Sequence, residues 1–262
     1  MSTAARRLGL ALAAAGLVLT GLLAGSLLAP GGGAARSSRG ALHVCDRYAV
    51  GKVQCSANAR REQVGVSLVA NVRGSAPLAV YRRAGDLRPA RRLQVAPGAR
   101  VLLVRASRRG GWLRVLLPVR PNGSSGWIST RRVVLRTDPY RVVVRLRAHR
   151  LTVWRGRRPV LRTPIGVGRA VTPTPRGLAY VTRLLKQPDP RGIYGPWAFG
   201  LSLYSPVLTS FGGGPGEVGI HGTNNPAGIG RDVSHGCIRL PNGAIERLAR
   251  LLPLGTPVFI RV

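Results

Sequence analysis

One thiol and two imidazoles stand close together in residues 218–242, a segment rich in glycine. Cys237 follows His235 by two positions and His221 by sixteen. A cysteine attacks a carbonyl carbon as its thiolate, and a neighbouring imidazole can take the thiol proton. A Cys–His pair is therefore the smallest unit that can perform acyl transfer. Gly236, directly before the thiol, permits a tight turn that would bring main-chain N–H groups towards an oxyanion.

Two other interpretations compete for this segment. A single cysteine near a histidine is more often a small buried hydrophobe than a nucleophile. Against that, the Gly, Asn and Ser content of the segment predicts a loop rather than a core helix or strand. The two imidazoles and the thiol could also ligate zinc, but no fourth ligand follows in a paired spacing and no acidic ligand is evident. We therefore expect neither a metal nor another cofactor.

Two motifs in the segment resemble the signature of the L,D-transpeptidase (YkuD-type) catalytic domain. They are HGT at residues 221–223 and SHGCIR at residues 234–239, with the TP-x-G-like element of that family matched at residues 172–177. The resemblance implies a cysteine acyltransferase that acts on the stem peptides of peptidoglycan. It covers the chain from about Tyr140 to the C-terminus.

Carried over position by position, the resemblance makes Cys237 the nucleophile and His221 the general base. The choice of His221 over His235 rests on the resemblance alone, because spacing favours neither. The residues expected to act in catalysis are Cys237, His221 and His235. The oxyanion region is expected at Ser234 and Gly236, together with His235. The residues expected to bind the substrate are Gly222, Thr223, Arg231 and Arg239. No Asp or Glu is clearly placed to orient His221: Asp232 is nearest in sequence, and a backbone carbonyl could do the same work.

The N-terminus predicts export from the cytoplasm. Arg6 and Arg7 precede an uncharged stretch of 23 residues, from Leu8 to Pro30. The apolar part of a cleaved signal usually has ~7–15 residues and a membrane-spanning helix needs ~20. We therefore predict an uncleaved signal anchor in residues 1–30, with a cleaved signal peptide as the alternative. Either way, the remaining chain is extracytoplasmic.

A linker is expected at residues 31–62, which are rich in Gly, Ala and Ser at their start. Cys45 and Cys55 lie within it, ten positions apart. In an exported protein such a pair is predicted to form a local disulfide. Cys237 is then the one unpaired thiol, as a reactive cysteine would be.

We expect a mainly β protein. Residues 63–137 consist of short apolar runs separated by turns such as Asn122-Gly123, which predicts about five strands in a small barrel. Within them, residues 112–127 resemble bacterial SH3-like domains, and that resemblance implies a wall-binding or positioning role. Simple core packing of the two tryptophans in this stretch, within an inert spacer, is the alternative.

Residues 138–262 are expected to form the β-rich catalytic domain. Alternation of valines and arginines predicts two strands in residues 141–168. Residues 193–206 are aromatic and glycine-rich, and they are predicted to be irregular and either to line a cleft or to fill a core corner. One short helix is predicted up to Leu252, with Asn242 as its cap.

The formal net charge of +33 would ordinarily indicate nucleic-acid binding. Export removes the chain from nucleic acid, and its arginines are spread over strands, where alternate charged positions form the solvated face. A cationic surface would instead attract anionic wall polymers and lipid headgroups. Arginine side chains near the site could bind the carboxylates of stem peptides through their guanidinium groups. The candidates are Arg176, Arg231 and Arg239.

The predicted function is therefore peptidoglycan L,D-transpeptidation, which forms 3→3 cross-links and releases a terminal D-amino acid. The same site could transfer the acyl group to water, as an L,D-carboxypeptidase, or to a protein that becomes attached to the wall. A non-enzymatic wall-binding protein is the remaining alternative.

Overall fold

The structure is a computed structural model that describes residues 65–94 and 100–262. The predicted signal anchor, the linker and the Cys45–Cys55 disulfide lie outside the described residues and stay predictions. Within the described part of the chain, no helix is both long enough and apolar enough to cross a membrane.

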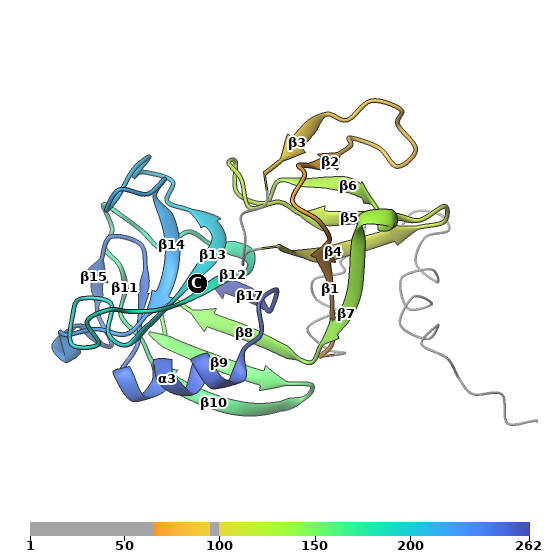
Figure 1. Cartoon of the computed structure of the whole chain (residues 1–262). Helices are drawn as coiled ribbons and strands as arrows, with labels where there is room; N and C mark the ends of the chain where they lie inside the picture. The colour runs from red at the N-terminus through yellow and green to blue at the C-terminus, as the bar shows by residue number, and fades with distance from the viewer. Residues whose placement is uncertain (1–64, 95–99) are drawn as a thin grey trace, which may run out of the picture. The chain divides into compact units, whose positions relative to one another are not determined.

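The first half of the described chain forms short antiparallel strands, as the sequence predicts. Five of them make one sheet in the order β6-β5-β4-β1-β7, and β2 and β3 form a separate hairpin (Figure 1). Their bounds are β1 (Ser67–Val72), β2 (Leu78–Val80), β3 (Arg91–Leu93), β4 (Val101–Arg108), β5 (Trp112–Leu116), β6 (Ser125–Ser129) and β7 (Val133–Asp138). Gly110, Gly111 and Gly123 take positive φ in the turns, where glycine carries no steric penalty. The SH3-like identity of this unit stays a prediction.

An eight-stranded sheet in the order β10-β9-β8-β17-β12-β13-β14-β16 dominates the second half. Its strands are β8 (Tyr140–Arg145), β9 (Arg150–Arg155), β10 (Arg158–Pro164), β12 (Gly177–Lys186), β13 (Trp197–Tyr204), β14 (Glu217–His221), β16 (Ile238–Arg239) and β17 (Pro257–Arg261). β11 (Val167–Gly168) and β15 (Asp232–Ser234) pair separately and in parallel. The chain is mainly β, as predicted.

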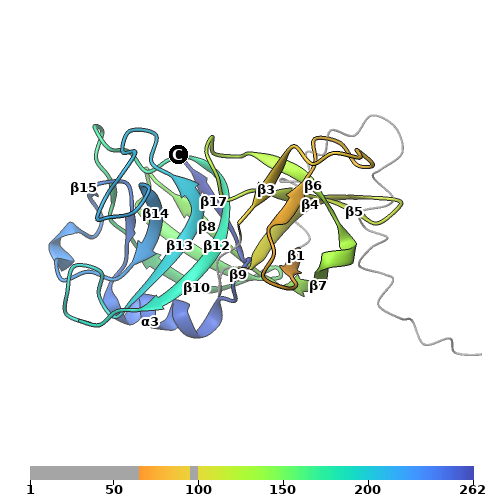
Figure 2. The ribbon, with the colours of Figure 1, turned by 45° about the horizontal axis from the view of Figure 1, so that its top comes forward.

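Two details of the predicted strands are wrong. Residues 141–168 contain β8, β9, β10 and the short β11 rather than two strands, because a tight turn at residues 146–149 adds a reversal that the valine–arginine alternation hides. Residues 193–206 are largely regular: β13 lies between β12 and β14 (Figures 1 and 2). The glycine in β13, Gly200, does not break the strand.

The one α-helix of the described residues is α3 (Asn242–Leu251). Ile245 and Leu248 on its apolar stripe are fully buried, as predicted. Asn242 is not its cap: Pro241 occupies the N-cap position, and Asn242 begins the helix. The Asn242 side chain instead accepts a hydrogen bond from the loop after β14.

Each sheet has its own buried core. The core of the eight-stranded sheet is built from alternate strand residues and the inner face of α3. Strand β12 contributes to both cores, because Ala179 and Val181 pack on one side and Tyr180 packs into the cluster of the first unit. β12 therefore has buried side chains on both of its faces.

Candidate active site

Strand β14 carries the site because its side chains alternate between the core and the opposite face. Val218 and Ile220 are buried in the core of the eight-stranded sheet. Glu217, Gly219 and His221 therefore share the other face. The sequence predicts a loop here, whereas His221 is in fact the last residue of a strand.

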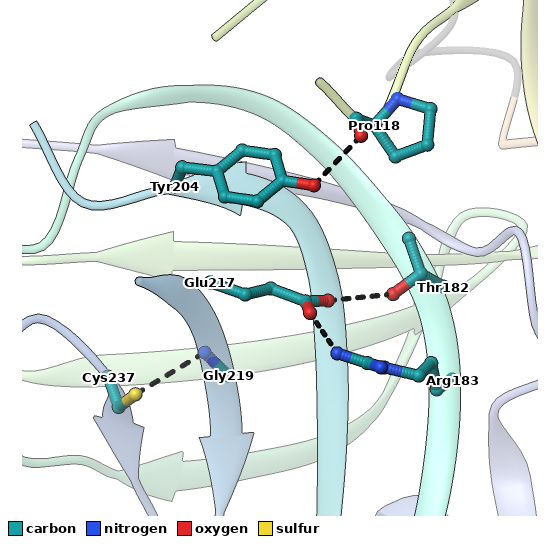
Figure 3. Close-up of polar contacts among 7 residues, drawn as sticks. All are labelled: Pro118, Thr182, Arg183, Tyr204, Glu217, Gly219 and Cys237. Atoms are coloured by element: carbon teal, nitrogen blue, oxygen red, sulfur yellow. Dashed lines mark hydrogen bonds and ion pairs between the residues drawn. The ribbon is translucent and has the colours of Figure 1, made fainter. Parts of the chain in front are cut away.

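Cys237 is brought to this face by the parallel pairing of β14 with β16. Ile220 lies opposite Ile238, and His221 lies opposite Arg239. Cys237, directly before β16, consequently lies beside Gly219, whose N–H donates to the Cys237 Sγ at 3.4 Å (Figure 3). The thiol and the imidazole of His221 are thus diagonal neighbours on one face of the sheet.

His221 is oriented by a main-chain carbonyl. Its Nδ1 lies 2.6 Å from the oxygen of Gly222. A carbonyl oxygen only accepts, so Nδ1 carries the proton and Nε2 keeps a free lone pair. The ring of Tyr194 packs edge-on against the imidazole, with centroids 4.9 Å apart. Asp232 does not orient His221, because its carboxylate pairs with His149 at 2.8 Å.

The electrostatics keep this imidazole neutral at pH 7. His221 is only 4% exposed. Burial lowers the pKa of His221 to about 4, the hydrogen bond with Gly222 opposes that change, and the positive charge of Arg239 adds to it. His221 is therefore a base that is available at neutral pH without first losing a proton.

Cys237 is a free thiol, and burial raises its pKa. The hydrogen bond from Gly219 and the charge of Arg239 lower the pKa of Cys237, and Glu217 raises it, without reversing the effect of burial. The resting pair is consequently thiol and imidazole rather than thiolate and imidazolium.

The turn before Cys237 is held by Ser234. Its hydroxyl donates to the Cys237 carbonyl at 2.6 Å and accepts from the Gly236 N–H at 3.1 Å. Gly236 has a φ of +117°, a conformation that L side chains rarely adopt. Thr172 braces the same turn by donating to the carbonyl of Ser234 at 3.2 Å. Because the Gly236 N–H already has a partner, Gly236 does not offer the free oxyanion donor that the sequence suggests.

His235 occupies a different position from His221. It is exposed, and its Nε2 lies 2.8 Å from Nη2 of Arg169. An arginine only donates, so Nε2 of His235 is engaged as an acceptor. The imidazole also stacks on Phe211, with centroids 5.3 Å apart. His235 therefore lines the site, and His221 is better placed to take the thiol proton.

A small pocket opens at the thiol. Its lining residues are Ser205, Leu208, Phe211, Gly216, Glu217, Val218, His235 and Cys237. The sequence predicts the last two of these as site residues, and Ser205 belongs to residues 193–206, which are predicted either to line a cleft or to fill a core corner. Within the described ranges, no three His, Cys, Asp or Glu side chains gather as a metal ion would need.

The expected substrate-binding residues fall into two groups. Gly222 and Thr223 are buried: the Thr223 N–H donates to Oδ1 of Asn242 at 2.8 Å, so these residues shape the loop after His221. Arg239 is half-buried opposite His221, and its Nε is buried without a hydrogen-bond partner. Arg231 is exposed, and it is not among the residues that line the pocket.

Glu217 lines the pocket, and the sequence does not predict it as a site residue. Its carboxylate accepts from Thr182 at 3.1 Å and pairs with Arg183, which reach it from β12 across β13 (Figure 3). Gly200 on β13 leaves room for this bridge, since a Cβ there would lie 2.6 Å from Oε1 of Glu217. Burial raises the pKa of Glu217, and Arg183 opposes the rise. Its position could have identified it, because Glu217 lies two residues before Gly219 and four residues before His221, on the same face of a strand.

Comparison with known proteins agrees with this geometry. The model of the YkuD family, the L,D-transpeptidase catalytic domain, matches residues 139–260. The YkuD protein of Bacillus licheniformis is 36% identical over 174 residues, which are 64% of this chain and 96% of that protein. The chain belongs to the L,D-transpeptidase family.

Further L,D-transpeptidases resemble the chain. The YkuD protein of Bacillus subtilis is 36% identical over 151 residues, or 55% of this chain and 84% of that protein. Among solved structures, the catalytic domain of an Enterococcus faecium L,D-transpeptidase is 26% identical, with a TM-score of 0.34, over 46% of this chain and 95% of that one. Cys237, His221 and the pocket lie within the part of the chain that matches the L,D-transpeptidase model.

Proposed function

We propose that the chain acts outside the cytoplasm as a peptidoglycan L,D-transpeptidase and forms 3→3 cross-links through a thioester on Cys237. The observation that carries the proposal is the state of His221. Its Nδ1 donates a hydrogen bond to the Gly222 carbonyl, and its lowered pKa keeps Nε2 unprotonated at neutral pH. A buried neutral base that shares a sheet face with a free thiol is what acyl transfer requires.

In the first half-reaction, the donor stem peptide presents the carbonyl between its third and fourth residues to Cys237. The sulfur attacks this carbon while the thiol proton passes to Nε2 of His221. The resulting oxyanion needs main-chain donors, and the Cys237 N–H is the candidate, because the Gly236 N–H is bonded to Ser234. Collapse breaks the amide bond, and His221 returns the proton to the departing terminal D-amino acid.

In the second half-reaction, the side-chain amine of an acceptor stem attacks the thioester carbonyl. His221 takes a proton from the attacking nitrogen, the carbon–sulfur bond breaks, and the thiolate recovers its proton. Water in place of the amine gives a tripeptide, and an amine of a protein gives attachment to the wall. These are distinct outcomes of the test below.

Charge supports binding of an anionic substrate. Arg239 lies opposite His221 on β16, and its Nε lacks a hydrogen-bond partner. A guanidinium can bind a stem-peptide carboxylate through two parallel hydrogen bonds. The net charge of +33 would also hold the protein near anionic wall polymers. Residues 1–30 would retain it at the membrane or direct its secretion, and the SH3-like unit would contact the wall.

The test uses the purified full-length chain in mild detergent with a disaccharide-tetrapeptide, and mass spectrometry follows both products and protein. We expect dimers that have lost one terminal D-residue and a protein species carrying the acyl group, both absent in Cys237→Ala. His221→Gln should lower turnover by about 10²–10⁴-fold, the usual contribution of a general base. His235→Gln should lower it much less.

Other products would change the assignment. Tripeptide without dimers would identify a carboxypeptidase. If the folded wild type neither forms the acyl species nor changes the substrate, the enzymatic proposal fails. Sedimentation with purified peptidoglycan would then test wall binding.

A further inference from the structure

The loop between β13 and β14, residues 205–216, forms much of the pocket wall at Cys237. Ser205, Leu208, Phe211 and Gly216 all line that pocket. The loop is not held by burial, since Phe211 is 44% exposed. Within the loop, the Ser205 N–H donates to the Gly216 carbonyl at 2.8 Å, which joins its two ends. The wall of the pocket therefore depends on how the base of this loop is fixed.

Arg120 fixes that base from another part of the chain. It lies in residues 117–124, the turn between β5 and β6 of the first unit. Its Nη1 donates to the carbonyl of Ser205 at 2.7 Å. Its Nη2 donates to the carbonyls of Leu208 at 2.9 Å and Pro215 at 3.0 Å. One guanidinium thus binds three carbonyls at both ends of the loop.

Neighbouring residues of the same turn hold Tyr204, the last residue before the loop. The Asn122 side chain exchanges two hydrogen bonds with the Tyr204 backbone, at 2.7 and 2.9 Å. The Tyr204 hydroxyl donates to the Pro118 carbonyl at 2.8 Å (Figure 3). Arg120 also lies over the Tyr204 ring, 5.1 Å from its centroid. Arg120 is therefore itself held in place, in addition to fixing the base of the loop.

The loop is shaped to receive Arg120. Gly216 has a φ of +69°, and a Cβ there would lie 2.2 Å from the Leu208 carbonyl oxygen and 3.2 Å from Nη2 of Arg120. Only glycine fits this close approach of the two sides of the loop beside the guanidinium. All three acceptors of Arg120 are main-chain carbonyls, so the contact fixes the path of the backbone independently of the loop's side chains. A lysine, with one ammonium group, could not reproduce the planar fork.

We propose that Arg120 is a positioning residue for the Cys237 pocket, so that the first β unit sets how the donor stem peptide fits. This rests on the proposed transpeptidase function for its substrate. The guanidinium acts on the wall of the pocket, while Cys237 and His221 are held by β14 and β16. Loss of Arg120 should therefore weaken substrate binding more than it slows the chemical step.

The experiment compares full-length wild type with Arg120→Ala and Arg120→Lys. Arg114→Ala is the matched control, because Arg114 is an exposed arginine of the same unit whose Nε contacts only Ser125 within the first sheet. Hydrogen exchange reports on residues 205–216, alkylation by iodoacetamide reports on access to Cys237, and kcat and KM are measured with the tetrapeptide.

For Arg120→Ala we expect exchange in residues 205–216 to become at least about tenfold faster, because three charge-assisted hydrogen bonds are lost. Exchange in β8 and β9 should stay as in the wild type. The alkylation rate of Cys237 should change by at least about threefold and KM should rise about tenfold, with kcat within about threefold. Arg120→Lys should recover only part of the effect, and Arg114→Ala should match the wild type.

Unchanged exchange in residues 205–216 of Arg120→Ala would overturn the proposal. An active enzyme whose loop loosens while KM stays constant would overturn it too. If the wild type has no turnover, the proposed function fails separately. Hydrogen exchange in residues 205–216 and alkylation of Cys237 then decide whether Arg120 positions the pocket. If both rates change in Arg120→Ala, the proposal is supported. If one of them stays at the wild-type value, it is refuted.

Discussion

Acidification should destabilise this protein through His221, and the size of the effect follows from its burial. The imidazole is 4% exposed, and its pKa falls from 6.5 to about 4 on folding. A group that binds its proton more weakly in the folded state contributes stability above the unfolded pKa. That stability is lost as the pH falls from 6.5 towards 4.

The magnitude comes from proton linkage between the two pKa values. Compared with neutral pH, protonation of His221 lowers the free energy of unfolding by about 2 kcal/mol at pH 5 and by about 3 kcal/mol at pH 4. With a urea m-value of about 2–3 kcal/mol/M, the loss at pH 5 moves the unfolding midpoint down by about 0.7–1 M.

The assay is urea unfolding followed by tryptophan fluorescence at pH 7.5, 6.5, 5.5 and 5.0. Other groups titrate in this range, so the quantity of interest is the difference between wild type and His221→Gln. That difference should shrink with falling pH by about 2 kcal/mol, because glutamine cannot take up the proton. His235→Gln, which removes an exposed imidazole, is the matched control and should keep the wild-type slope.

Two results would refute the reasoning. If wild type and His221→Gln keep a constant difference from pH 7.5 to 5.0, His221 is not buried as a neutral group. If the difference grows as the pH falls, the folded state binds the proton more tightly. That sign would indicate a resting ion pair of Cys237 thiolate and imidazolium.

Three further predictions concern the site and its support. The alkylation rate of Cys237 by iodoacetamide should rise with pH to a midpoint above that of an ordinary thiol, since burial raises its pKa; a midpoint below neutrality would contradict a resting thiol. Gly236→Ala, at φ +117°, should lower the free energy of unfolding in urea by about 1–3 kcal/mol. Gly243→Ala, with open space around the position, should leave it unchanged or raise it. Gly200→Ala, whose methyl would lie 2.6 Å from Oε1 of Glu217, should lower the thermal midpoint by several degrees, as overpacking of about 1–3 kcal/mol implies; an unchanged midpoint would show that the bridge can shift freely.

The strands and the proposed pair of Cys237 and His221 could be predicted because their signals are local. Short apolar runs separated by turns predict about five strands in residues 63–137, where the structure has seven, β1 to β7. The HGT and SHGC motifs identify His221 and Cys237, and the structure brings both to one face of the sheet. Geometry then distinguishes His221 from His235, which spacing could not do, because the two imidazoles differ in burial and in hydrogen-bond partner.

The remaining parts depend on contacts between residues distant in sequence. Asn242 has the residue type of a helix cap, but its amide oxygen is taken by the N–H of Thr223, nineteen positions earlier. Arg120 reaches a loop that begins 85 positions later. Neither contact leaves a periodic pattern, so local propensity cannot detect it.

Glu217 shows how the same alternation that builds the core also builds the site. On β14, Val218 and Ile220 enter the core, so Glu217 and His221 must both face away from it. Burial of each polar side chain is offset in a different way. His221 donates a hydrogen bond from Nδ1 to a carbonyl and stays neutral, whereas Glu217 forms an ion pair with Arg183 across Gly200. An ionised carboxylate two residues from Gly219 opposes thiolate formation at Cys237. Thr182 and Arg183 hold that carboxylate in place, so the β12–β14 bridge fixes a charged group that acts on the Cys237 thiol.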